Sequence, residues 1–117
     1  MALNNNAKNA MLSGLAGVAT YASLHDDDPG ATGDNELSGG SYARKQVTWD
    51  SPANGEMALV TQPEFDVPAT STVKYMGLWS AASSGTFYGY GPVDEESFAN
   101  AGKYKVTSFT VTVSDPS

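Results

Sequence analysis

The chain has 117 residues, which is typical of one domain, and 40% of them are hydrophobic, as in globular rather than disordered proteins. Six basic residues stand against 13 acidic ones, giving a net charge of −7, so the chain lacks the clustered basic face that nucleic acid requires. Cysteine is absent, which excludes disulfides, zinc–thiolate sites and thiol nucleophiles.

The N-terminal part predicts one helix. An asparagine at position 4, 5 or 6 can cap it, and apolar residues follow at helical spacing, so we expect a helix over about residues 5–16 that ends at Gly17 and packs on a sheet. The stretch has no basic n-region and is interrupted by glycines, which argues against a signal peptide. No run approaches the ~18 apolar residues of a membrane-spanning helix, so we expect no membrane partner and assembly in a cytoplasm.

The remainder predicts short antiparallel strands. Residues 19–25 alternate, and 26–41 form an acidic loop rich in glycine and proline. Alternating segments separated by turn residues then predict further strands at 42–49, 56–60, 64–67, 72–79, 86–93 and 104–113. This pattern is mainly β, and we expect a jelly-roll-like antiparallel β-sandwich with one short N-terminal helix, forming a single domain over residues 1–117.

The sequence offers little for catalysis. His25 is the only histidine, and with Asp26 it would be the natural base for a hydrolase, but no Gly-x-Ser-x-Gly nucleophile elbow is present. We expect His25 to be a half-exposed residue at a strand end. Glu95 and Glu96 are the other acid/base candidates, and we expect them on an exposed loop. We therefore predict no catalytic residue and no enzyme.

The acidic loop concentrates oxygen ligands without a known metal-binding pattern. The residues that would hold a divalent cation are Asp26, Asp28, Asp34 and Glu36. The EF-hand spacing fails because glycine and alanine follow where further ligands are needed. We predict a solvated loop, with no metal and no cofactor.

Aromatic residues suggest a surface for partners. Strict alternation places Phe87 and Gly89 on one face of a strand, and Tyr88 and Tyr90 on the other. If the first face is core, both tyrosines are free for an interface or for stacking on sugars. Trp79 is expected in the core.

Several motifs resemble a known family. They are 7–18, Tyr21-Ala22-Ser23-Leu24-His25, Asp28-Pro29-Gly30, 35–45, 65–69, 77–81 and 85–89. The most specific is Asn-Glu-x-x-Gly-Gly-x-Tyr-Ala-Arg at 35–44. Together they resemble small virion proteins of tailed phages, many infecting actinobacteria, that are often labelled tail fibre or minor structural protein.

The resemblance implies a non-enzymatic structural component of a phage virion, assembled in the host cytoplasm. Without heptads or repeats for a shaft, we favour a capsid decoration protein docked on the major capsid lattice. The alternative is a minor tail, tail-fibre or tail-tip protein that binds host glycans. Its partners would be other virion proteins and copies of itself.

Arg44 lies in the most specific motif, just after the Gly39-Gly40 turn. An arginine can make two parallel bonds to one carboxylate, and Glu36 across the turn is the nearest candidate. We predict that Arg44 and Glu36 pair within the chain or between subunits.

Overall fold

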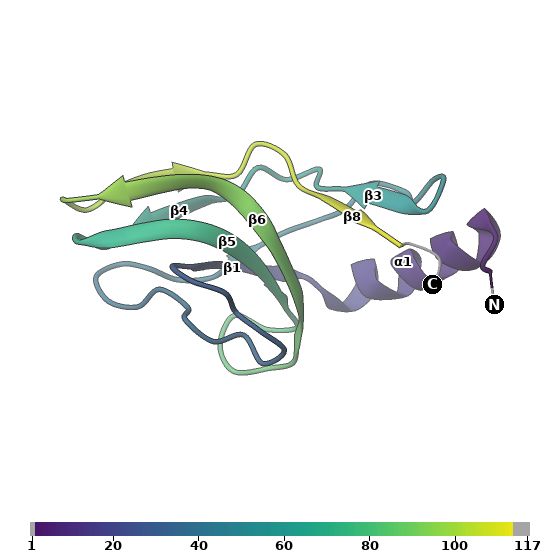
Figure 1. Ribbon diagram of the computed structural model, residues 1–117, viewed down its shortest axis with the longest axis horizontal. Helices are drawn as coiled ribbons and strands as arrows, with labels where there is room; N and C mark the ends of the chain where they lie inside the picture. The colour runs from purple at the N-terminus through teal and green to yellow at the C-terminus, as the bar shows by residue number, and fades with distance from the viewer. Residues whose placement is uncertain (1, 114–117) are drawn as a thin grey trace.

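A computed structural model describes residues 2–113. It is mainly β, with one helix and antiparallel sheets, as the sequence predicts. Within residues 2–113 there are eight strands rather than the seven that the sequence predicts, and the jelly-roll arrangement stays a prediction. The shape is elongated, 47 × 26 × 25 Å, and Figure 1 shows helix α1 and the β3–β8 pair at one end and the long curved strands at the other.

Helix α1 spans Asn5–Val18, so the expected start is right and Gly17 does not end it. The Asn4 side chain caps it by accepting from the Ala7 amide at 2.9 Å. Its only fully buried residue is Leu12. Asn9 accepts from the Gly55 amide at 3.0 Å, and α1 therefore packs on strand β3 rather than on the large sheet.

The largest sheet has four antiparallel strands in the order β2-β1-β5-β6. These strands are β1 (Tyr21–His25), β2 (Lys45–Gln46), β5 (Ser71–Trp79) and β6 (Phe87–Phe98). Two smaller antiparallel pairs complete the fold: β3 (Glu56–Ala58) with β8 (Thr110–Thr112), and β4 (Glu64–Val67) with β7 (Gly102–Lys105).

The core lies between the large sheet and the two strand pairs. Leu24 and Met76 of the large sheet pack in one cluster with Phe65 and Tyr104 of the β4–β7 pair. All four residues Ala22 to His25 of β1 are buried. Because neighbouring side chains of a strand point to opposite faces, β1 must be covered on both sides. The acidic loop covers the second side of β1.

Two expected strands are broken by changes of partner. Of 42–49, only β2 pairs with β1, and Trp49 then bridges to Leu59. The continuous strand expected at 104–113 is also wrong. Val106 bonds back to Pro63 beside β4, and the chain crosses over so that the Phe109 carbonyl accepts from Leu59 beside β3. Pairing thus resumes only in β8.

Strand β6 is longer than expected and irregular. It runs through Asp94, Glu95 and Glu96, so the loop predicted for these carboxylates is wrong, although their exposure is right. Phe87 lies opposite Trp79 and Gly89 lies opposite Leu78, which leaves Tyr88 without a partner in a β-bulge. The alternation of faces predicted along this segment therefore fails at Tyr88.

Candidate functional site

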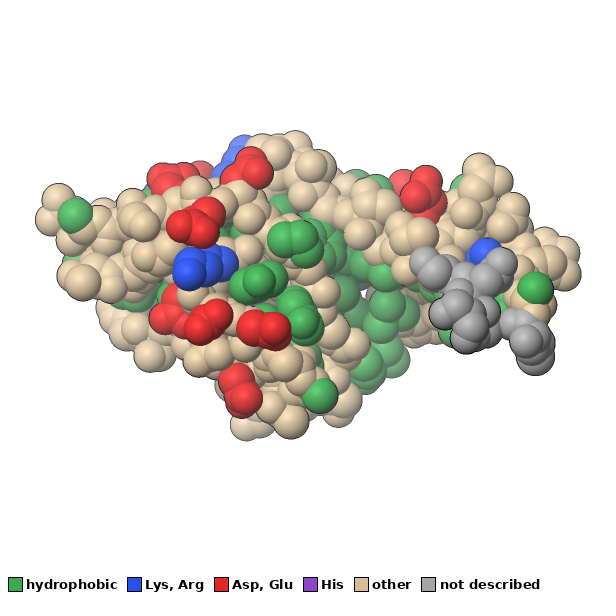
Figure 2. Space-filling model, viewed as in Figure 1, with side chains coloured by type: hydrophobic (Ala, Val, Ile, Leu, Met, Phe, Trp, Pro, Cys, Tyr) green, Lys and Arg blue, Asp and Glu red, His purple; other side chains and the backbone are tan. Residues whose placement is uncertain are grey.

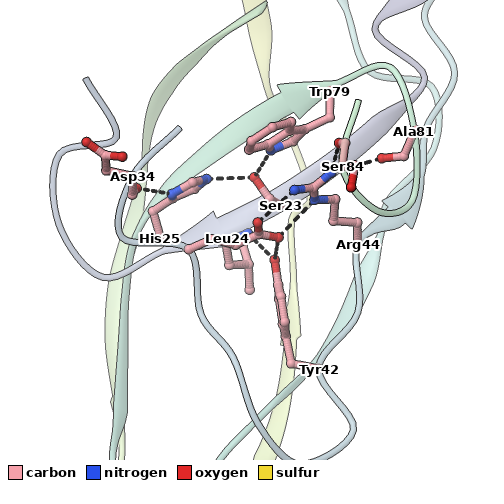
Figure 3. Close-up of polar contacts among 10 residues, drawn as sticks. Ser23, Leu24, His25, Asp34, Tyr42, Arg44, Trp79, Ala81 and Ser84 are labelled. Carbon is pink, nitrogen blue, oxygen red and sulfur yellow. Dashed lines mark hydrogen bonds and ion pairs between the residues drawn. The ribbon is translucent and has the colours of Figure 1, made fainter. Parts of the chain in front are cut away.

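Arg44 joins three segments that are distant in the sequence (Figure 3). Its Nε and Nη2 donate to the two carboxylate oxygens of Glu36 at 3.0 and 2.9 Å. Its Nη1 donates to the carbonyls of Ala81 and Ser84 at 3.1 and 2.8 Å. The guanidinium also lies 3.7 Å from the ring centre of Trp79. Arg44 therefore fastens the acidic loop and the β5–β6 hairpin loop to the chain before β2.

Tyr42 completes this cluster, which we call the Arg44 clamp: Glu36, Tyr42, Arg44, Trp79 and the loop 80–85. The Tyr42 hydroxyl donates to Glu36 at 2.8 Å and accepts from the Leu24 amide at 3.0 Å. Burial raises the pKa of Tyr42 well above its ordinary value of 10.0, so the hydroxyl keeps the proton that it donates. The side chains of Arg44 and Glu36 are only 9% and 22% exposed.

Beside the clamp lies a buried chain of hydrogen bonds (Figure 3). The Trp79 indole donates to Ser23 Oγ at 2.8 Å, and Ser23 Oγ lies 2.6 Å from His25 Nε2. His25 Nδ1 lies 2.7 Å from the carbonyl of Asp34, which can only accept, so Nδ1 carries the proton. Nε2 is then the acceptor for the Ser23 hydroxyl.

His25 is completely buried, so the half-exposed position predicted for it is wrong. Burial is the main reason that the pKa of His25 lies below its ordinary value of 6.5. The ring is oriented by the Asp34 backbone and not by the Asp26 carboxylate. Although Ser23 and His25 are in contact, both are 0% exposed, so a substrate has no access to this pair in the folded chain.

A groove of about 500 Å³ lies beside β6. Tyr88, Tyr90 and Phe109 line it together with Leu15 of α1 and hydroxyl-bearing residues of the β8 segment. Tyr88 and Tyr90 are 39% and 42% exposed, and their role in an interface stays a prediction. Figure 2 shows hydrophobic side chains gathered around the hollow between the sheet and the helix-bearing end.

Tyr90 also connects the groove with the acidic loop. A hydrogen bond from its hydroxyl to Asp28 is the main reason that the pKa of Tyr90 is raised. Its ring makes an edge contact with Tyr75 at 5.6 Å. Tyr90 lies opposite Gly77, on the face that also carries Trp79 and Phe87.

The family model described as Gp80, podophage GP4 fiber I protein gp80, matches residues 2–114. The chain belongs to this family. None of the curated proteins compared with the chain matches it.

Membership of the Gp80 fibre family confirms the resemblance to small virion proteins of tailed phages. A structural phage protein of this kind associates with other virion proteins. The family description names a fibre, which favours the tail-fibre alternative and gives no support to the capsid decoration protein that we preferred from the sequence.

The residues considered for a metal do not come together in this family member. Across residues 2–113, no three histidine or acidic side chains are placed to hold a metal ion. Asp28 caps the Gly30 amide at 2.8 Å, Asp34 accepts from Thr32 at 3.1 Å, and Glu36 is engaged by Arg44. Asp26 is exposed beside them.

Among residues 2–113, α1 is too short and too polar to span a bilayer, and the structure describes no other helix there.

Reasoning from the sequence missed Ser23 and Trp79 as polar partners. Ser23 and His25 are two residues apart on a strand, so their side chains share a face. Their spacing in the sequence could therefore have predicted the contact between them. The approach of Trp79 and Tyr42 depends on tertiary structure. Arg44 and Glu36, by contrast, form the predicted pair within one chain.

Proposed function

We propose that the chain is a non-enzymatic component of a podophage tail fibre that acts by docking on other virion proteins. The observation that carries this proposal is the family match, which spans nearly all of the chain and describes a fibre protein. The position of Ser23 and His25 also supports it, because both side chains are buried and a substrate cannot reach them in the folded chain.

The docking surface in this proposal has two parts. One part is the pair of loops that the Arg44 clamp holds together, 26–41 and 80–85. Loops fixed on a rigid scaffold are well suited to recognition, because little conformational entropy is lost when a partner binds. The other part is the exposed strip of Tyr88 and Tyr90, since aromatic side chains supply large contact areas at interfaces.

Deletion of the gene from the phage tests the proposal. We expect particles whose heads retain DNA on heating as the parent does, but which lack one fibre and adsorb poorly to host cells. Complementation with the wild-type chain should restore the fibre. Heads that lose DNA or burst at lower temperature, on particles with a complete set of fibres, would contradict the proposal and indicate capsid decoration.

A second candidate function is binding of a neutral host saccharide in the groove beside β6. It is favoured by the lining, which combines Tyr88, Tyr90 and Phe109 with the hydroxyls of Ser108 and Thr110, and in which none of the lining residues within 2–113 is charged. Rings suit the apolar C–H faces of sugars, and hydroxyls suit their polar edges. Calorimetry with host-surface polysaccharide should detect binding that Tyr88→Ser weakens. Equal binding by both proteins would refute this candidate.

A further inference from the structure

The hydrogen-bond chain around His25 requires a neutral imidazole. Ser23 Oγ has one hydrogen, which goes to His25 Nε2, and it accepts from the Trp79 indole. Protonation at Nε2 would aim two donors at Ser23 Oγ and would leave the Ser23 hydroxyl hydrogen without its acceptor. In the described part of the chain, no buried side-chain nitrogen or oxygen lacks a partner, so the neutral arrangement is fully satisfied.

The acidic loop is what separates His25 from water. Asp34 accepts from His25 Nδ1, and Gly33 lies so close to Trp79 and Phe87 that a Cβ atom there would be 2.5 Å from the indole ring. The ends of the loop are joined to each other, because Asp26 N donates to the Asn35 carbonyl at 3.1 Å. The segment 26–35 can therefore lift as a unit about its base while Glu36 stays on Arg44.

The charged groups around His25 do not supply a direct anionic partner. Asp26 and Glu36 favour the protonated ring by charge alone, whereas burial and Arg44 oppose it. The carboxylate of Glu36 is already engaged by Arg44 and Tyr42. From β5 and β6 the ring faces Gly77 and Phe87, which do not titrate, and Tyr75 is its backbone partner across the sheet.

We propose that His25 is a proton-sensitive latch that keeps segment 26–35 on the sheet at neutral pH and releases it in mildly acidic solution. A buried imidazolium without an anionic partner is unfavourable, and lifting this segment is the most direct way for water to reach the ring. Release would also separate Asp28 from Tyr90, so the latch would alter both parts of the proposed docking surface. This inference concerns the isolated chain and does not depend on where the chain lies in a virion.

Nuclear magnetic resonance of the whole chain tests the latch directly. His25 is the only histidine, so its ring protons report its titration without ambiguity. We expect titration below 6.5 and, as the pH falls below 6.5, a loss of hydrogen-exchange protection at the Trp79 indole N–H, which donates to Ser23 beneath the segment, together with loss of the nuclear Overhauser contact between Gly33 and the Trp79 ring. The loss of protection should approach about tenfold per pH unit until His25 itself titrates, because one proton is taken up on opening.

Two comparisons make the test decisive. The amides of the β4–β7 pair serve as the internal reference, and they should keep their protection. His25→Gln removes the titration, so the protection of its Trp79 indole N–H should not depend on pH between 7.5 and 5. Titration of His25 at 6.5 or above, protection of the Trp79 indole N–H that is unchanged by pH, or loss that occurs equally in the reference strands would each overturn the latch. The same would follow if the loop of a folded His25→Gln protein still opened on acidification.

Discussion

Replacing Arg44 by alanine should destabilise the protein strongly, because the arginine is 9% exposed and serves four acceptor atoms in two loops. Glu36, which is 22% exposed, would remain with only the Tyr42 hydroxyl as its partner. Breaking a buried ion pair costs about 3 to 5 kcal/mol, and the partial exposure of Glu36 places this change near 3 kcal/mol. For a chain of this size that corresponds to a fall in Tm of about 12 °C.

Urea unfolding followed by circular dichroism measures this change. Arg44→Lys keeps the charge but cannot make two parallel bonds, so it should recover roughly half of the loss. The double variant Arg44→Ala with Glu36→Ala should be less destabilised than the sum of the single changes. Lys103→Ala is the matched control, because it removes an exposed ion pair with Asp66 and should leave the unfolding midpoint unchanged. If Arg44→Ala and Arg44→Lys both unfold like the parent, the clamp does not stabilise the fold.

Three further predictions follow from the described contacts. Gly77→Ala should lower the free energy of unfolding by about 1 to 3 kcal/mol, because its Cβ would lie 2.7 Å from His25 Nε2. Gly14→Ala should raise the free energy of unfolding by about 1 kcal/mol, because Gly14 lies on α1 with open space around it. Urea titrations that reverse this order would contradict the packing. Because the pKa of His25 is lowered in the folded chain, the unfolded chain binds more protons below pH 6.5. The free energy of unfolding should therefore fall as the pH drops below 6.5. Denaturant midpoints that stay constant between pH 7 and 5 would refute this prediction. Tyr88→Ser with Tyr90→Ser should reduce incorporation into virions, measured by quantitative mass spectrometry, with little change in Tm; normal incorporation would exclude this strip as a docking surface.

Much of the local structure could be predicted because its causes are local. Asn4 and the helical spacing of apolar residues locate α1, and alternation locates β1, β4 and β5. The Arg44–Glu36 pair could be predicted because few cations are present and a glycine turn brings these two residues together.

The features that failed depend on which segments become neighbours. Alternation predicts that 104–113 can be a strand, but not that its first half pairs with β4 and its second half with β3. The bulge at Tyr88 comes from the register between β5 and β6, which alternation within one strand does not specify. His25 is buried because the loop that follows β1 folds back over it, and alternation within a strand does not specify the path of the next loop.

An asymmetric cryo-electron microscopy reconstruction of the virion tests the central claim most directly. We predict that the fold of residues 2–113, with its long curved β5 and β6 strands and its projecting α1, fits density in a fibre attached to the tail (Figure 1). The loops of the Arg44 clamp or the Tyr88–Tyr90 strip should face a neighbouring subunit or the solvent-exposed end of the fibre. Density for this fold on the capsid lattice, or its absence from the particle, would contradict the account.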